Sequence, residues 1–119
     1  AAREKRHLAM EARLKSGLWL KAMIRTYNVQ GISATVARRG DPDAGAVLIK
    51  FNQLALGCTV YGQSRRADGE LAWMPATGPE PIAETDADAY IARQVARDPD
   101  LWVLEIEDEK GRRLFGPIG

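Results

Sequence analysis

The chain has 119 residues, 45% of them hydrophobic, and a formal net charge of +1 at neutral pH. This length is typical of one domain with one core, so no metal, cofactor or disulfide is needed to stabilise the fold. A single cysteine, Cys58, and a single histidine, His7, exclude disulfide frameworks, thiolate zinc clusters and most histidine-based catalytic sites. The sequence contains no apolar run long enough to span a membrane and no signal-peptide pattern, so we expect a cytoplasmic protein.

The charges are unevenly distributed along the chain. Residues 1–15 carry a charge of +3 and predict a basic, flexible N-terminal extension, which leaves residues 16–119 as the single domain. Within that domain, residues 80–109 contain ten Asp or Glu but only two Lys or Arg. This asymmetry favours either packing of the acidic segment against the more basic strands or pairing between two copies of the chain.

The first predicted element is a helix over about residues 18–28, where apolar side chains recur at helical spacing. Ser16 is expected to cap this helix and Gly31 to end it in a left-handed conformation. The density of apolar residues over 18–24 leaves a strand as the alternative. From Ile32 to about Arg39 the pattern alternates with period two, which predicts a half-buried strand.

Residues 39–45, Arg-Gly-Asp-Pro-Asp-Ala-Gly, predict a tight turn. Pro42 presets the backbone dihedral, Asp41 can accept a bond from a following amide, and Gly45 is expected to adopt a dihedral closed to other residues. The run that follows, residues 46–53, is apolar on both faces. It therefore predicts the central strand of a sheet, covered on both sides near its start.

Two further strands are predicted at 58–65 and 70–75, joined by Asp68-Gly69, a strong hairpin signal. Pro75 indicates that the second of them ends there or lies at a sheet edge. Together with the two preceding strands they form a predicted four-stranded antiparallel meander.

A second helix is predicted from about residue 86 to residue 97, capped by Thr85 and stopped before Pro99, and a fifth strand at 101–107. The resulting prediction is an α+β domain of order α-β-β-β-β-α-β. Its antiparallel sheet has about five strands, with both helices packed on one face.

Several stretches together resemble the bacterial family known as domain of unknown function 1491. They are residues 13–19, 38–47, 71–73 with 77–81, 90–94 and 98–102. The resemblance extends from about Arg13 to Gly111 and implies a compact, stand-alone domain of the bacterial cytoplasm. It implies no activity, because the family has no established catalytic or binding residues.

Candidate catalytic groups are few. Asp41 and Asp43 are the best carboxylate pair and could hold Mg²⁺ with a third ligand such as Asp68, but capping of the turn explains the same residues. Cys58 lies in a strand pattern typical of a small buried hydrophobe. We therefore predict a protein that is not an enzyme, with no metal site.

The sequence leaves several binding functions open. The leading hypothesis is a protein-interaction or self-associating module, whose homodimer would pair the edge strand ending at Pro75. Its candidate partner surface comprises Arg38, Lys50, Tyr61, Arg66 and Trp73. One alternative is single-stranded nucleic-acid binding by a sheet face carrying Arg38, Lys50, Tyr61 and Arg65. Another is a small-ligand or anion sensor that uses Arg39, Asp41, Asp43, Gly45 and Arg65.

Overall fold

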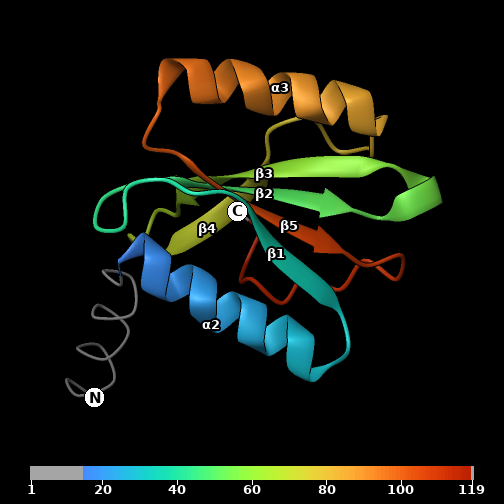
Figure 1. The fold of residues 1–119 in the computed structure, drawn as a ribbon, viewed down its shortest axis with the longest axis horizontal. Coiled ribbons are helices and arrows are strands. Elements are labelled where there is room, and N and C mark those ends of the chain that lie inside the picture. Colours follow the sequence, from blue (N-terminus) through green and yellow to red (C-terminus); the bar gives the residue numbers. More distant parts are fainter. Residues whose placement is uncertain (1–14, 119) are drawn as a thin grey trace.

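The computed structural model describes residues 15–118, so the predicted extension lies outside the described residues except for Lys15. The chain forms an α+β domain in the predicted order of elements (Figure 1). These are α2 (Ser16–Val29), β1 (Ser33–Arg38), β2 (Val47–Asn52), the 3₁₀ turn η1 (Leu54–Leu56), β3 (Cys58–Arg65), β4 (Leu71–Pro75), α3 (Glu84–Arg97) and β5 (Trp102–Glu107). Within residues 15–118, none of the helices has the length and hydrophobicity that a membrane span requires.

The five strands form one mixed sheet of order β1-β5-β2-β3-β4. β5 lies between β1 and β2, antiparallel to β1 and parallel to β2, with Ile49 opposite Leu104. The predicted four-stranded meander is therefore wrong at its first step and holds only for β2, β3 and β4. The physical reason is that β5 is almost as thoroughly buried as β2, so both strands need neighbours on each side.

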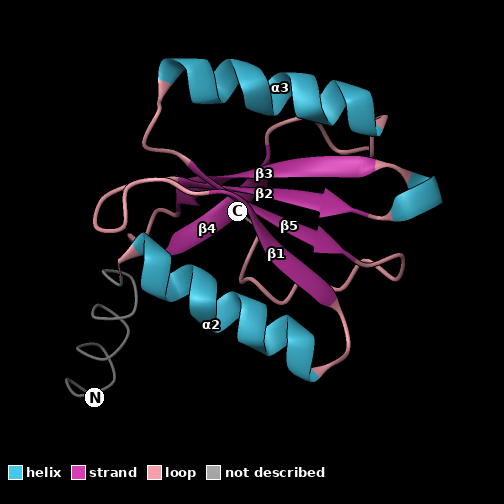
Figure 2. Cartoon of the chain, in the orientation of Figure 1, coloured by secondary structure: helices cyan, strands magenta, loops and turns pink. Residues whose placement is uncertain are grey.

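The two helices cover opposite faces of the sheet (Figure 2), which corrects the prediction that both lie on one face. Every residue of β2 is buried, because its side chains alternate between the two covered faces of the sheet. Val47, Ile49 and Phe51 pack on the α2 side, whereas Leu48 packs on the α3 side. A strand that is apolar on both faces requires a cover on each, and one helix supplies each cover.

The helix ends follow the predicted signals only in part. Gly31 has a positive φ of 75° and ends α2 as expected. Ser16, however, is the first helical residue, and its hydroxyl donates to the carbonyl of Gly45 instead of capping the helix. Thr85 likewise lies inside α3, which begins at Glu84 without a side-chain cap. The Ser16 bond ties the start of α2 to the loop that precedes β2.

The segment after β5 returns to the α2 face and covers part of the outer edge of β4. Phe115 is buried in the core, and its carbonyl accepts a bond from the indole nitrogen of Trp73 at 3.1 Å. The amide of Trp73 donates to Pro117 at 2.9 Å, and Trp73 forms a bridge with Ile118. Trp73 is only 1% exposed, so the prediction that it belongs to a partner surface is wrong, and the edge predicted for self-pairing is covered there.

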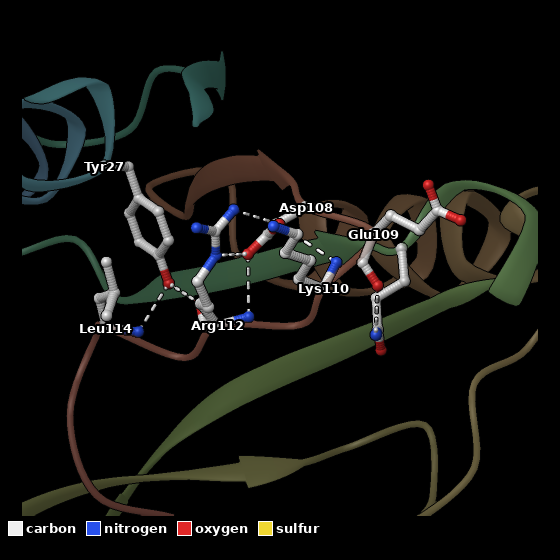
Figure 3. Close-up of polar contacts among 7 residues, drawn as sticks. Tyr27, Asp108, Glu109, Lys110, Arg112 and Leu114 are labelled. Carbon is white, nitrogen blue, oxygen red and sulfur yellow. Dashed lines mark hydrogen bonds and ion pairs between the residues drawn. The ribbon is translucent and has the colours of Figure 1, made fainter. Parts of the chain in front are cut away.

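A polar network fixes the turn that starts this return (Figure 3). The carboxylate of Asp108 accepts bonds from the Arg112 side chain, with Nε and Nη2 each at 2.9 Å, and from the amides of Arg112 and Lys110. The hydroxyl of Tyr27 donates to the carbonyl of Arg112 at 2.7 Å and accepts from the amide of Leu114 at 2.8 Å. Burial raises the pKa of Tyr27 to about 12, so this hydroxyl keeps its proton at any physiological pH.

The network predicts an acid-sensitive contribution to stability. The Arg112 guanidinium, aided by the amides of Arg112 and Lys110, lowers the pKa of Asp108 to about 2. A carboxyl with a lowered folded-state pKa stabilises the fold above its unfolded-state pKa of about 4, and this stabilisation is lost as the pH falls from about 4 to 2. Urea unfolding should therefore show a stability difference between the wild type and Asp108→Asn at pH 6 that shrinks toward pH 2.

Asp68→Asn, which removes an exposed carboxylate from the turn between β3 and β4, controls for the loss of one negative charge. A difference between the wild type and Asp108→Asn that stays constant from pH 6 to pH 2 would contradict the assignment.

Candidate functional site

A pocket of about 690 Å³ lies between the start of α2, the end of β1 and the loop 39–45. α2 and β1 meet at the turn around Gly31, where the amide of Ile32 donates to Tyr27 at 3.0 Å. The pocket lies at the opposite end of this helix–strand pair, where residues 15–21 face residues 36–39. Its floor includes Trp102, the first residue of β5.

The polar lining is predominantly cationic. Among the described residues it contains the four cations Lys15, Lys21, Arg38 and Arg39 and one carboxylate, Asp43. Lys15 and Asp43 form an exposed ion pair at 3.2 Å, which leaves three cations without a carboxylate on the pocket wall. The guanidinium of Arg38 is fixed at the strand end, because Nη1 donates to the carbonyls of Pro99 and Leu101 at 2.9 and 2.7 Å. This end of the domain therefore presents positive charge to a ligand.

The apolar lining is partly exposed to solvent. Leu18 on α2 is 55% exposed and Val36 on β1 is 40% exposed, although both border the same pocket. Leu20 and Trp102 lie deeper and are buried. The site thus combines exposed aliphatic side chains with a cationic rim, a pairing that suits a ligand with both apolar and acidic groups.

The loop 39–45 forms a hydrogen-bonded wall of the pocket. The Asp41 carboxylate accepts bonds from the amides of Asp43 and Ala44 at 2.8 and 3.0 Å, as the turn prediction required. Bonds from the Ala44 and Asp43 amides hold the pKa of Asp41 below its usual range. The carbonyl of Asp41 also accepts the indole N–H of Trp102 at 2.6 Å, which attaches the loop to β5.

Two glycines allow this attachment. A Cβ at Gly40 or Gly45 would lie 2.1 or 2.2 Å from the carbonyl oxygen of Asp100, closer than real Cβ contacts allow. Gly45 does not have a positive φ, so the prediction that it adopts a dihedral closed to other residues finds no support there. Glycine is required there because the backbone of Asp100 leaves no room for a side chain.

The predicted ligand residues are only partly brought together. Arg39 and Asp43 line the pocket, while Asp41 and Gly45 build its wall without contributing to its lining. Arg65 does not line the pocket; its Nη1 donates to the carbonyl of Gly69 at 3.0 Å within the β3–β4 turn. The pocket residues on α2 were not predicted from the sequence. The pattern that could have indicated them is apolar Leu18 beside cations at the start of an amphipathic helix.

The single sheet face predicted for nucleic acid does not form. Lys50 is 6% exposed and points toward α3, where its Nζ lies 2.7 and 2.8 Å from Glu84 and Asp88. Tyr61 is also buried, but in the cluster on the α2 side. Helices cover both faces, so these two residues are neither adjacent nor accessible, and Arg66 lies apart from both in the exposed β3–β4 turn.

Lys50 lies among three carboxylates, those of Glu84, Asp88 and Glu105. Burial alone would lower the pKa of Lys50, but the Asp88 and Glu84 carboxylates, helped by Glu105 at 3.6 Å, raise it above its ordinary value. Lys50 therefore stays charged and links β2 to α3 and β5. Burial also raises the pKa of the Cys58 thiol, in keeping with the predicted role of a small core residue. No group of three His, Cys, Asp or Glu within 15–118 could hold a metal.

A family model described as protein of unknown function (DUF1491) matches residues 14–116. The chain belongs to the DUF1491 family. This confirms the resemblance drawn from the sequence. Three of the stretches on which that resemblance rested, 13–19, 38–47 and 98–102, each contribute residues to the pocket of this DUF1491 domain.

Solved structures agree with this assignment. A crystal structure of a DUF1491 family protein from Caulobacter crescentus CB15 is 42% identical, with a TM-score of 0.79, and covers 89% of this chain and 99% of its own. An NMR structure of a DUF1491 family protein from the same organism is 40% identical, with a TM-score of 0.75. The match covers 90% of this chain and 97% of that protein's chain. The solution structure of protein Atu0922 from A. tumefaciens is 26% identical, with a TM-score of 0.68. The match covers 80% of this chain and 86% of that protein's chain. No curated protein matched the chain.

The tight contact at Gly45 predicts that Gly45→Ala is costly. The new Cβ would force the loop 39–45 away from Asp100, so we expect a loss of about 1–3 kcal/mol in the free energy of unfolding. Urea unfolding measures this loss, and the NMR signal of the Trp102 indole N–H should move because its acceptor belongs to the same loop.

Gly62→Ala is the matched control, because its Cβ would meet only Leu48 Cδ2 at 3.8 Å, an ordinary contact. Equal effects of the two substitutions would reject the close-packing explanation for Gly45.

The Lys50 cluster predicts a second stability effect. Lys50→Met keeps an unbranched chain but leaves the Glu84, Asp88 and Glu105 carboxylates together without their shared cation. We expect the free energy of unfolding, measured in urea, to fall by about 1–3 kcal/mol. Rotation of the half-exposed Glu84 and Asp88 carboxylates into water would bring the loss toward the lower value. Lys110→Met, at an exposed position, should change stability by less than about 0.5 kcal/mol. An unchanged free energy of unfolding in Lys50→Met would show that the cluster adds nothing to stability.

Proposed function

We propose that this domain is a non-catalytic protein-interaction module that binds an acidic, partly apolar segment of a partner in the pocket between α2 and β1. The observation that carries this proposal is that exposed Leu18 and Val36 share one concavity with Lys21, Arg38 and Arg39. Exposed aliphatic side chains beside cations that have no carboxylate on the described pocket wall match a segment that carries both apolar and acidic side chains.

The chemistry of the lining supports binding over catalysis. Among the described residues that border the pocket there is no His, Cys, Ser, Thr or Tyr. The one carboxylate, Asp43, is already paired with Lys15. A reaction needs a nucleophile, a base or an acid placed near the substrate, whereas this lining supplies, besides the paired Asp43, cations and apolar surface.

The same lining favours a protein segment over a simple anion. An inorganic anion would contact only the cations. Of these, Nη1 of Arg38 already donates hydrogen bonds to the carbonyls of Pro99 and Leu101. Such an anion would leave Leu18 and Val36 in contact with water. A segment with aliphatic side chains would cover these two residues and would place carboxylates against Lys21 and Arg39.

The proposal can be tested with a blocked peptide, acetyl-Glu-Glu-Leu-Thr-Val-Thr-Ser-amide, titrated into the isotope-labelled full chain and followed by NMR. We expect shifts of the Trp102 indole N–H and of the amides of Leu18, Val36 and Arg39, since these residues border the pocket. The peptide with both Glu replaced by Lys should leave these signals unmoved. Shifts confined to the turn between β3 and β4 would overturn the proposal.

A pair of charge-reversal variants sharpens the test. Arg39→Glu should weaken peptide binding about tenfold, because it exchanges an attractive for a repulsive charge at the rim. Arg66→Glu makes the same change at an exposed position away from the pocket and should alter affinity less than about twofold. Equal effects of the two variants would reject the pocket as the site.

Oligothymidylate serves as the competing ligand in the same titration. If it shifts the pocket signals more strongly than the peptide does, with steep salt dependence, the site binds nucleic acid and the proposed function is wrong.

A further inference from the structure

The two edges of the sheet differ in accessibility. At the β4 edge, the amide of Trp73 already donates to Pro117 at 2.9 Å, and Trp73 pairs with Ile118. At the β1 edge, no strand within residues 15–118 pairs with the outer side. An open strand edge is a template for a further strand, because its backbone N–H and C=O groups lack partners on that side.

This open edge leads directly into the pocket. Val36, Ala37 and Arg38 belong to β1, Arg39 follows it, and all four line the pocket. We infer that the partner segment binds as an added antiparallel β-strand along β1, with its side chains reaching into the pocket; this inference rests on the function proposed above. Main-chain bonds to β1 would then supply affinity, and the pocket would supply specificity.

The cover that α2 provides stops partway along β1. Ala34 and Val36 lie opposite Ile106 and Leu104, both of which belong to the core cluster on the α2 side. Ala34 is 3% exposed, whereas Val36 is 40% exposed. The uncovered apolar surface therefore begins at Val36 and continues to Leu18 across the pocket, where an apolar side chain of the added strand would be buried.

The charges along β1 set the direction of the added strand. Its end carries Arg38 and Arg39, while its start lies beside acidic residues of β5, with Thr35 opposite Glu105 and Ser33 opposite Glu107. Carboxylates are therefore favoured only at the Arg38 end. In an antiparallel strand that end is the N-terminal one, so the segment should read acidic, then apolar, then neutral. Antiparallel pairing is also slightly more stable per residue than parallel pairing.

The test is a backbone methylation scan of the peptide acetyl-Glu-Glu-Leu-Thr-Val-Thr-Ser-amide, with binding to the full chain measured by NMR titration. Each methyl group removes one amide donor, and only alternate amides of an added strand face its neighbour. We expect alternate positions to lose affinity about tenfold and the intervening positions to change it less than about threefold. Amides of β1 that face outward should also exchange more slowly with solvent when the peptide is bound.

Each other outcome has a definite meaning. If every methylated peptide binds equally while Arg39→Glu still weakens binding, the pocket binds the segment but the added strand is rejected. If no peptide shifts the pocket signals, the proposed function fails and the inference fails with it. If acetyl-Ser-Thr-Val-Thr-Leu-Glu-Glu-amide binds more tightly, the antiparallel direction is wrong. If the β1 amide signals depend on protein concentration without peptide, the edge binds a second copy instead.

Discussion

The insertion of β5 between β1 and β2 is the constraint on which the rest of the structure depends. It is possible because the loop 39–45 lies directly against Asp100, with Gly40 and Gly45 leaving no side chain in the way. Hydrogen bonds to backbone carbonyls then hold β5 in place. The Trp102 indole donates to Asp41 in the loop, and the Arg38 guanidinium donates to Pro99 and Leu101 just before β5. The same contacts shape the pocket wall, so one packing arrangement sets the sheet order and the geometry of the candidate site.

Local features of the fold were readable from the sequence, and long-range pairing was not. Element positions followed from periodicity, and the end of α2 from Gly31, because these signals act over a few residues. The predicted sheet order is wrong because strand pairing depends on segments that are distant in the sequence. The apolar pattern on both faces of the 46–53 run is nonetheless typical of a parallel strand with a helix on each face, although it is also compatible with a meander.

The candidate site shows the same division. The loop 39–45 could be recognised because turn chemistry is local, but its partners on α2 and β1 lie together only through tertiary packing. Lys50, Tyr61 and Trp73 misled the surface prediction, since alternation shows which residues share a face and not whether a helix covers that face. Lys50 and Asp108 each lie in a charge cluster within contact of at least one oppositely charged side chain. The pocket wall differs from both, because three of its described cations have no carboxylate on the wall.

The C-terminal residues that cover β4 have a consequence for assembly. A sheet open on two sides can extend indefinitely, as copies join side to side into a growing ribbon. Pro117 and Ile118 cover the β4 side at Trp73, so within residues 15–118 the β1 side is the more open of the two. Joining through β1 alone stops at two chains, whether the second is a partner or an identical copy, and the cover at Trp73 disfavours further growth through β4.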